Sequence, residues 1–261
     1  MNTDEKARQE TFMWSRTTFH SEYNRYLAQF KVESCIENIR GNSLLDLACG
    51  DGLMTGMFAQ KVPRVVGVDA NSKILAEARK RQPEIEFHES LVEDLDLSEK
   101  FDTVTMLDLL EHVVDPIALL KKAASFLNND GVLIVHVPNA QAINRRLAVL
   151  MGTLENCEEL SPFDINVAGH RRSYSLTSLK ADIAAAGLKC ESTGGIFYKI
   201  LSTPQMDWFL KNGPWEEGGF GWGRVGAEKA KDWRAEFCRA SYELGKQHPE
   251  DCNVIYACVT K

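Results

Sequence analysis

Residues 44–52 read Leu44-Leu45-Asp46-Leu47-Ala48-Cys49-Gly50-Asp51-Gly52, an apolar run that passes through an acid into a turn with two glycines. Roughly twenty residues after this acid, a second apolar run, Val65-Val66-Gly67-Val68, ends on Asp69. The pattern predicts a strand, a glycine turn, a helix and a second strand that ends in a carboxylate. An α/β fold holds an adenosine-containing cofactor in this way.

The spacing of the glycines separates two kinds of cofactor site. A dinucleotide fingerprint reads G-x-G-x-x-G, but here the third glycine, Gly56, comes one residue late. Asp46 and Asp51 would repel a pyrophosphate and suit a ligand that carries an ammonium group. Asp69 suits a ribose diol because an ionised carboxylate accepts hydrogen bonds from both hydroxyls. Together these features predict S-adenosylmethionine as the cofactor.

Four segments resemble motifs of the class I S-adenosylmethionine-dependent methyltransferases. Asp46 to Gly52 resembles the first motif of that family and Val66 to Asp69 the second. Phe101 to Val113 is similar to the fourth-strand motif of the subgroup typified by the ubiquinone-biosynthesis O-methyltransferases, and Asn128 to Val135 resembles the turn into the fifth strand. The resemblance covers residues 40 to 200 and implies a Rossmann-like fold and a methyl-transfer reaction.

Length and composition predict one α/β domain with an added lid or arm. The 261-residue chain is 44% hydrophobic, which is enough for a full core. A net charge of −7 without a basic stripe argues against long nucleic acids as partners. No apolar run approaches the roughly 20 residues of a membrane span. The seven cysteines are scattered and no signal peptide is recognised, which predicts reduced thiols and a cytoplasmic protein.

Hydrophobic periodicity and turn signals predict alternating strands and helices. Strands are expected near 43–47, 64–69, 84–88, 101–107, 131–137, 188–200 and 252–259. Helices are expected near 20–39, 52–61, 71–82, 115–127, 142–151 and 175–186. The alternation implies a doubly wound, mostly parallel seven-stranded sheet with helices on both faces. Residues 1–19 are expected to be loosely held, and residues 152–173 to form a long functional loop.

The predicted organisation has three parts. Residues 1–40 form an N-terminal helical cap, residues 41–200 and 251–261 form the S-adenosylmethionine-binding methyltransferase domain, and residues 201–250 form an insertion before the last strand. The insertion holds four of the five tryptophans, Trp208, Trp215, Trp222 and Trp233. Tryptophans at this density indicate a buried mini-core, a dimer surface or a pocket wall, so a homodimer formed through the insertion is among the alternatives.

Cofactor contacts are expected beyond the carboxyl ends of the strands, where ligands of open α/β sheets bind. The resemblance places the adenine at residues 90–92. Many relatives have an aspartate where this chain has Leu91, so backbone N–H and C=O groups would bind the adenine ring here. The resemblance also places the Leu107 carbonyl against the cofactor ammonium, and Tyr23 on the first helix over the cofactor. The predicted cofactor-binding residues are Tyr23, Asp46, Ala48, Gly50, Gly52, Asp69, Ala70, Ser90, Leu91, Val92 and Leu107.

Catalytic residues are expected where an acceptor could meet the methyl group. Methyl transfer from a sulfonium is an in-line displacement, so the protein mainly has to align the acceptor atom with the methyl carbon. A hydroxyl acceptor also gains from a general base, and histidine is the usual one near neutral pH. His170 lies in a His-Arg loop of the kind that sits over the acceptor pocket in the subgroup, and Asp108 follows the fourth strand. These two are the predicted catalytic residues, whereas His112 is expected to bond mainly to backbone. Arg171-Arg172 are a predicted site for an acceptor phosphate or carboxylate.

A metal site is the alternative for the same region. Asp108, Glu111 and His112 have helical spacing, and with His170 they resemble the metal constellation of some RNA-terminal and ubiquinone-pathway methyltransferases. Asp108 stands where those proteins have glutamate, and many relatives with the same Glu-His pair need no metal. No resident metal is therefore predicted.

The leading predicted function is transfer of a methyl group from S-adenosylmethionine to oxygen or nitrogen of a small polar acceptor. Sugars, nucleotide-linked sugars, amino or amide nitrogens and phenolic metabolites are all compatible with the sequence. A non-catalytic S-adenosylmethionine-binding interaction module, with the tryptophan-rich insertion as its partner surface, is the second reading. An NAD-dependent oxidoreductase is the third, which the glycine spacing and the acidic turn oppose.

Overall fold

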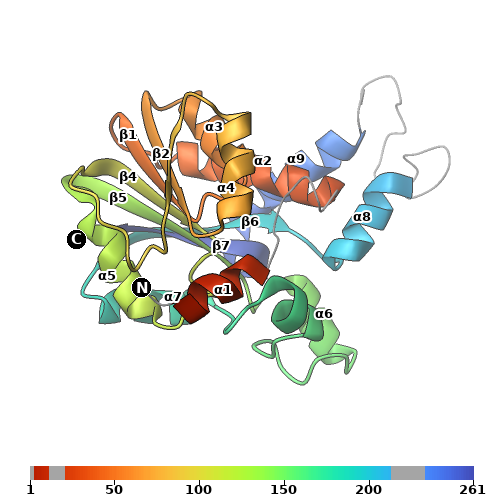
Figure 1. Ribbon diagram of the computed structural model, residues 1–261. Helices are drawn as coiled ribbons and strands as arrows, with labels where there is room; N and C mark the ends of the chain where they lie inside the picture. Colours follow the sequence, from red (N-terminus) through yellow and green to blue (C-terminus); the bar gives the residue numbers. More distant parts are fainter. Residues whose placement is uncertain (1–2, 12–20, 213–232) are drawn as a thin grey trace.

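A seven-stranded sheet forms the centre of the computed structural model, which describes residues 3–11, 21–212 and 233–261 (Figure 1). The strand order is β3-β2-β1-β4-β5-β7-β6, parallel through β5, with β7 antiparallel between β5 and β6. This arrangement confirms the predicted mostly parallel, Rossmann-like fold. The strands are β1 (Ser43–Leu47), β2 (Arg64–Asp69), β3 (Glu86–Glu89), β4 (Phe101–Leu107), β5 (Leu127–Pro138), β6 (Lys189–Tyr198) and β7 (Cys252–Thr260).

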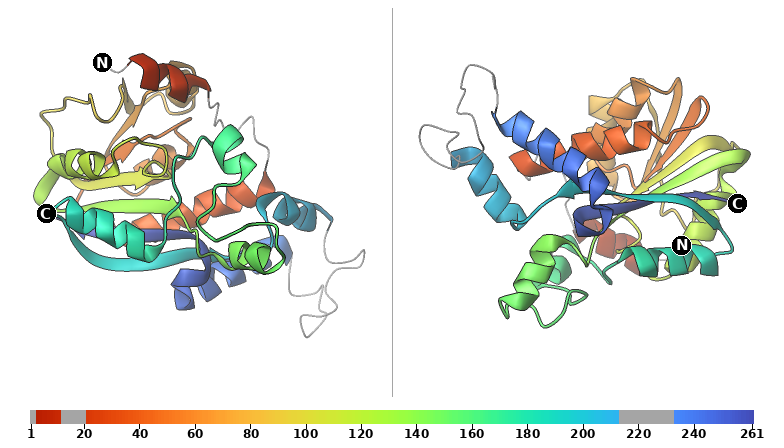
Figure 2. Two further views of the ribbon diagram at one scale, coloured as in Figure 1. Left: turned by 90° about the horizontal axis from the view of Figure 1, so that it is seen from below. Right: turned by 180° about the vertical axis from the view of Figure 1, so that it is seen from behind.

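Helices cover both faces of the sheet, and the right-hand view of Figure 2 shows α2 and α9 on one side with α7 on the other. Neighbouring residues of β1 divide between the faces, since Leu44 packs with α2 and α3 whereas Leu45 packs with α5 and α7. The helices are α1 (Thr3–Thr11), α2 (Glu22–Ile36), α3 (Leu53–Ala59), α4 (Ser72–Arg81), α5 (Pro116–Ser125), α6 (Ile143–Leu150), α7 (Leu176–Ala185), α8 (Thr203–Asn212) and α9 (Trp233–Gln247), with the π-helix η1 (Asp164–Ala168) and the 3₁₀ helix η2 (Pro249–Asp251).

Side-chain caps explain where two of these helices begin. Asn71 accepts hydrogen bonds from the backbone N–H groups of Lys73 and Ile74 at the start of α4. Asp115 accepts from Ala118 N–H at the start of α5, where proline holds the first helical position. Of the helices that the structure describes, none has the length and apolar character needed to cross a bilayer.

The N-terminal segment differs from its prediction. Residues 3–11 form helix α1 instead of a loosely held stretch. Its side chains reach two distant parts of the chain, because Lys6 pairs with Glu89 at 2.6 Å and Glu5 pairs with Arg171 at 2.7 Å. These partners are remote in sequence, so composition alone could not reveal that the segment docks.

The tryptophan-rich insertion is described only in part. Helices α8 and α9 pack with α2 and β6 around a second apolar cluster that includes Tyr23, Phe197 and Tyr242. Trp233 meets Phe209 edge-on at the rim of this cluster, whereas Trp208 is exposed. Trp215 and Trp222 lie outside the described residues. The homodimer stays a prediction.

Candidate functional site

A cavity of about 380 Å³ lies at the carboxyl ends of the parallel strands, within the size range of small-molecule sites. Its described lining comes from α1, α2, the first turns of α3 and α4, the turns that follow β1, β2, β3 and β4, the end of β5, the η1 loop and β7. The strand order reverses between β1 and β4, so the cavity occupies the switch point at which ligands of open α/β sheets bind.

The glycine turn after β1 presents backbone to this cavity. Gly50 has φ +55°, and a Cβ built on it would meet no atom within 4 Å, so its open side is available to a ligand. Gly52 has φ +71°, and its Cβ would come within 2.9 Å of the Ala78 side chain on α4. The first glycine therefore leaves room for a ligand, and the second lets α4 pack against the turn.

Asp69, at the end of β2, is a fixed and desolvated carboxylate in the cavity wall. It accepts hydrogen bonds from Gly50 N–H at 2.9 Å and from Asn71 N–H at 2.8 Å. Burial raises the pKa of the Asp69 carboxyl above its usual value, against the effect of these N–H donors. A carboxylate has about four lone-pair positions, so acceptor capacity is left for a diol.

Three of the predicted cofactor-binding residues do not belong to the described lining of the cavity. The buried Asp46 carboxylate accepts from the Thr55 hydroxyl at 2.7 Å and from the Thr105 hydroxyl at 2.9 Å, which joins β1 to α3 and β4. Gly52 packs against α4, as described above. Tyr23 is fully buried, with its ring edge-on to Phe197 at 5.1 Å.

The other predicted residues do come together in the cavity wall. Four residues of α2 line the cavity in place of Tyr23, namely Asn24, Leu27, Ala28 and Lys31. The predicted residues that line the cavity are Ala48, Gly50, Asp69, Ala70, Ser90, Leu91, Val92 and Leu107, together with Asp108 and His170. Contact of these residues with S-adenosylmethionine stays a prediction.

Lys31 is a site residue that sequence reasoning missed. It is the only lysine or arginine among the described residues that line the cavity, and its side chain is 5% exposed. Its ammonium forms an ion pair with the Asp108 carboxylate, 77 residues away in sequence. A lysine one turn from Leu27 on the apolar face of the predicted helix was the available signal.

His112 and His170 face each other in the cavity. Their ring centroids are 4.9 Å apart and the rings are nearly perpendicular. Ligand atoms of these two histidines and of Glu111 all lie within 4.8 Å of one another. The sequence predicted that His112 bonds mainly to backbone, but in the structure it also lines the same cavity as His170.

Burial shifts the pKa values of Glu111, His112 and His170 so that the uncharged form of each side chain is favoured. It lowers the pKa of His112 to about 4, with His170 as the second cause, and it lowers the pKa of His170. Burial, and then the Asp108 charge, raise the pKa of Glu111 well above its usual value. At neutral pH both imidazoles are therefore uncharged and able to accept a proton.

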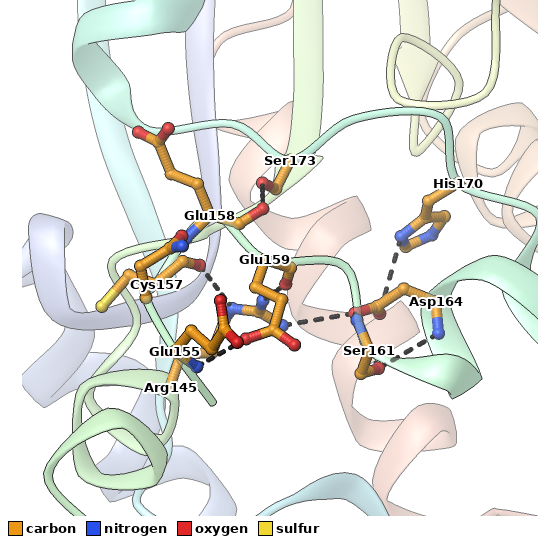
Figure 3. Close-up of polar contacts among 10 residues, drawn as sticks. Arg145, Glu155, Cys157, Glu158, Glu159, Ser161, Asp164, His170 and Ser173 are labelled. Atoms are coloured by element: carbon orange, nitrogen blue, oxygen red, sulfur yellow. Dashed lines mark hydrogen bonds and ion pairs between the residues drawn. The ribbon is translucent and has the colours of Figure 1, made fainter. Parts of the chain in front are cut away.

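The long loop that carries His170 is tied together from within (Figure 3). Arg145 on α6 donates to the Cys157 carbonyl at 3.0 Å and contacts the Asp164 carboxylate. Asp164 also accepts from the Ser161 hydroxyl at 2.8 Å, and its backbone carbonyl accepts from His170 N–H at 2.8 Å. The Asp164 carboxylate lies 3.7 Å from His170 Nδ1, which is beyond normal hydrogen-bond length.

The side chains of Arg171 and Arg172 are engaged by groups of the chain itself. Arg171 donates from Nε to the His112 carbonyl and pairs with Glu5, and the Arg172 guanidinium donates to backbone carbonyls of the turn after β4. Neither residue belongs to the described lining of the cavity. The prediction that this pair binds an acceptor phosphate or carboxylate is therefore not supported.

Comparison with known proteins gives a family match. A methyltransferase-domain family model matches residues 19–193. A ubiquinone biosynthesis O-methyltransferase from Haemophilus ducreyi is 32% identical over 139 residues, which cover 49% of this chain and 57% of the relative. One from Rhodopseudomonas palustris is 31% identical over 124 residues, which cover 46% of this chain and 48% of the relative. The chain thus spans about half the length of these curated relatives.

A solved structure supports the fold over most of the chain. It is an S-adenosylmethionine-dependent methyltransferase, possibly acting on histamine by its description, from Thermotoga maritima. The TM-score is 0.55 at 18% identity, and the match covers 92% of this chain and 94% of that one. At this identity the likeness shows the fold alone.

Proposed function

Because the chain belongs to the methyltransferase-domain family, as a class I S-adenosylmethionine-dependent methyltransferase, we propose that it transfers a methyl group to oxygen or nitrogen of a small polar acceptor. One observation carries the proposal: the glycine turn, Asp69 and the His112–His170 pair line a single cavity. A place for the methyl donor and a group that accepts a proton therefore stand side by side.

The donor side of the cavity, formed by Gly50, Asp69, Leu107 and Lys31, fits S-adenosylmethionine. When bound, this cofactor supplies the methyl group of its sulfonium. The open side of Gly50 admits the ligand close to the backbone, and the Asp69 carboxylate would hold the ribose hydroxyls. The Leu107 carbonyl would accept from the cofactor ammonium. Lys31, the one lysine or arginine in the described lining, pairs with Asp108, and because an ammonium has three N–H donors it would also serve the cofactor carboxylate.

The acceptor side is built from His170, His112 and Asp108. An uncharged His170 imidazole takes the proton that the acceptor loses as its oxygen or nitrogen bonds to the methyl carbon and the carbon–sulfur bond breaks. Asp108 has φ +55° directly after β4 and is held by Lys31, which fixes its carboxylate at the cavity wall. The protein thus mainly aligns the acceptor and removes its proton.

Sugars and amino sugars are the acceptor class that the remaining lining favours. Asn24 and Asn253 bring side-chain amides, which both donate and accept hydrogen bonds as sugar hydroxyls do. Phe163, half exposed on the loop, adds an apolar ring on which the C–H face of a sugar can rest. Phenolic and amine metabolites are the competing acceptors.

Turnover with an acceptor panel tests the proposal. We expect release of S-adenosylhomocysteine with sugar or amino-sugar acceptors above the acceptor-free background, and calorimetric binding of S-adenosylmethionine but not of NAD. Cofactor binding without turnover on any acceptor would favour the non-catalytic module. NAD binding without S-adenosylmethionine binding would refute the proposal.

A metal-assisted version of the same reaction has one observation in its favour. Both oxygens of the buried Glu111 carboxylate have no hydrogen-bond partner among the described residues, and Glu111, His112 and His170 could together hold a divalent cation. Such an ion would polarise an acceptor hydroxyl.

Metal removal separates the two versions. Since we propose His170 as the proton acceptor, we expect turnover to survive treatment with EDTA and gel filtration within about twofold, an effect of well under 1 kcal/mol in the barrier. The comparison is untreated enzyme assayed in the same metal-free buffer. Loss of turnover that Mg²⁺, Mn²⁺ or Zn²⁺ restores would replace the metal-free mechanism.

A further inference from the structure

The turn after β4, residues 110–114, carries Glu111 and His112 but has few partners of its own for its backbone carbonyls. The Arg172 guanidinium supplies donors to three of them: Nη1 to Leu110 O at 3.1 Å, Nη1 to Val113 O at 2.6 Å and Nη2 to Val114 O at 3.1 Å. A planar fork of N–H donors suits such a cluster of carbonyls, which an ammonium could not span.

The neighbouring arginine completes the set. Arg171 N–H donates to Glu111 O at 2.8 Å, and Arg171 Nε donates to His112 O at 2.9 Å. The carbonyls of five consecutive residues, 110 to 114, therefore all accept from Arg171 or Arg172. This clamp joins two segments that are about sixty residues apart in sequence and each carry one histidine of the site.

Both histidines of the site lie next to the clamp. His112 lies inside the clamped turn, and His170 directly precedes the two arginines. Their rings are 4.9 Å apart at nearly a right angle. We propose that Arg172 is a positioning residue, which sets the distance and orientation of His112 relative to His170 without touching the acceptor. The proposal rests on the proposed function for its catalytic consequence.

Arg172 is singled out over Arg171 because both of its terminal nitrogens, Nη1 and Nη2, donate to the turn. The Arg171 side chain is partly exposed and also pairs with Glu5 on α1, so its removal would disturb α1 as well. Arg172 has backbone carbonyls as its hydrogen-bond partners in the described chain. Leu110 and Val113 are buried, so removing the donors to their carbonyls leaves two acceptors that this conformation of the turn does not satisfy.

Two measurements on Arg172→Met test the proposal. In proton NMR, we expect the nuclear Overhauser contact between the His112 and His170 rings to disappear. With the acceptor found by the panel, we expect kcat to fall at least about tenfold, because a small misplacement of reacting groups costs up to about a hundredfold in rate. The dissociation constant of S-adenosylmethionine should change less than about twofold. Added guanidinium should restore part of the lost kcat.

Arg40→Met is the matched control. Arg40 also donates to a backbone carbonyl, that of Asp130, and forms an ion pair, with Glu191, but it lies away from the cavity. The control should keep the ring contact, kcat and cofactor binding. Arg172→Lys covers the case in which Arg172→Met does not fold, because it keeps the charge and loses the fork, and we expect the same loss of ring contact.

The outcome of the NMR measurement does not depend on the acceptor. A ring contact that persists in both Arg172 variants would overturn the proposal, as would an unchanged kcat in a variant that has lost the contact. If the wild-type chain fails to bind S-adenosylmethionine, the proposed function fails while the ring contact still decides the role of Arg172.

Discussion

Replacing Asp69 with alanine is expected to weaken S-adenosylmethionine binding by about two orders of magnitude. The carboxylate is held by Gly50 N–H and Asn71 N–H, and it lines the cavity with its remaining lone pairs. Hydrogen bonds to a charged group contribute about 1.5–3 kcal/mol each, so loss of the pair to a ribose diol costs about 3 kcal/mol, or about a hundredfold in Kd. Isothermal titration calorimetry measures this change directly.

The control for this variant is an acidic residue of the neighbouring strand. Glu86 on β3 is exposed and pairs with Arg64 at 2.7 Å, and it does not belong to the described lining of the cavity. Glu86→Ala should bind S-adenosylmethionine as the parent chain does. Asp69→Asn keeps the shape but loses the charge and should fall between the two. Unchanged binding by Asp69→Ala would remove Asp69 from the ribose site.

The sequence could predict the donor side of the cavity because its signals are local. β1, the glycine turn and β2 follow one another in the chain, and the glycines after Leu47 and the acid Asp69 indicate where the two strands stop. What the pattern could not decide is which way each acid faces. Asp46 turns to the hydroxyls of Thr55 and Thr105, whereas Asp69 reaches the cavity. Side chains alternate between the two faces of a strand, so a shift of one residue in the strand register would change which face each acid points to.

The acceptor side depends on contacts between distant segments, which no local pattern encodes. Glu5 meets Arg171 across 166 residues, and Lys31 meets Asp108 across 77. The prediction that Arg171-Arg172 bind an acceptor anion is not supported, although two adjacent guanidiniums resemble an anion site in sequence. In the structure their donors go to carbonyls of the turn after β4 and to the Glu5 carboxylate. Only the fold shows that those carbonyls need donors there.

Replacing His170 with glutamine is expected to lower kcat by about 10²–10⁴-fold, the usual range for loss of a general base, with little change in cofactor affinity. Burial lowers the pKa of His170, so the imidazole is uncharged and active at neutral pH. Activity should be full above this pKa and should fall as the pH drops through it. The acid limb of the kcat/KM profile should therefore lie below about pH 6.5, the ordinary histidine value, and should disappear in the variant.

His248→Gln serves as the control, because this histidine is exposed next to η2 and does not belong to the described lining of the cavity. It should leave both kcat and the acid limb as they are in the parent chain. An acid limb that persists unchanged in His170→Gln would assign the proton transfer to another group, and His112 is the histidine that shares the cavity, with its ring 4.9 Å away. The double variant His112→Gln/His170→Gln would then decide, since two interchangeable bases lose their activity only together.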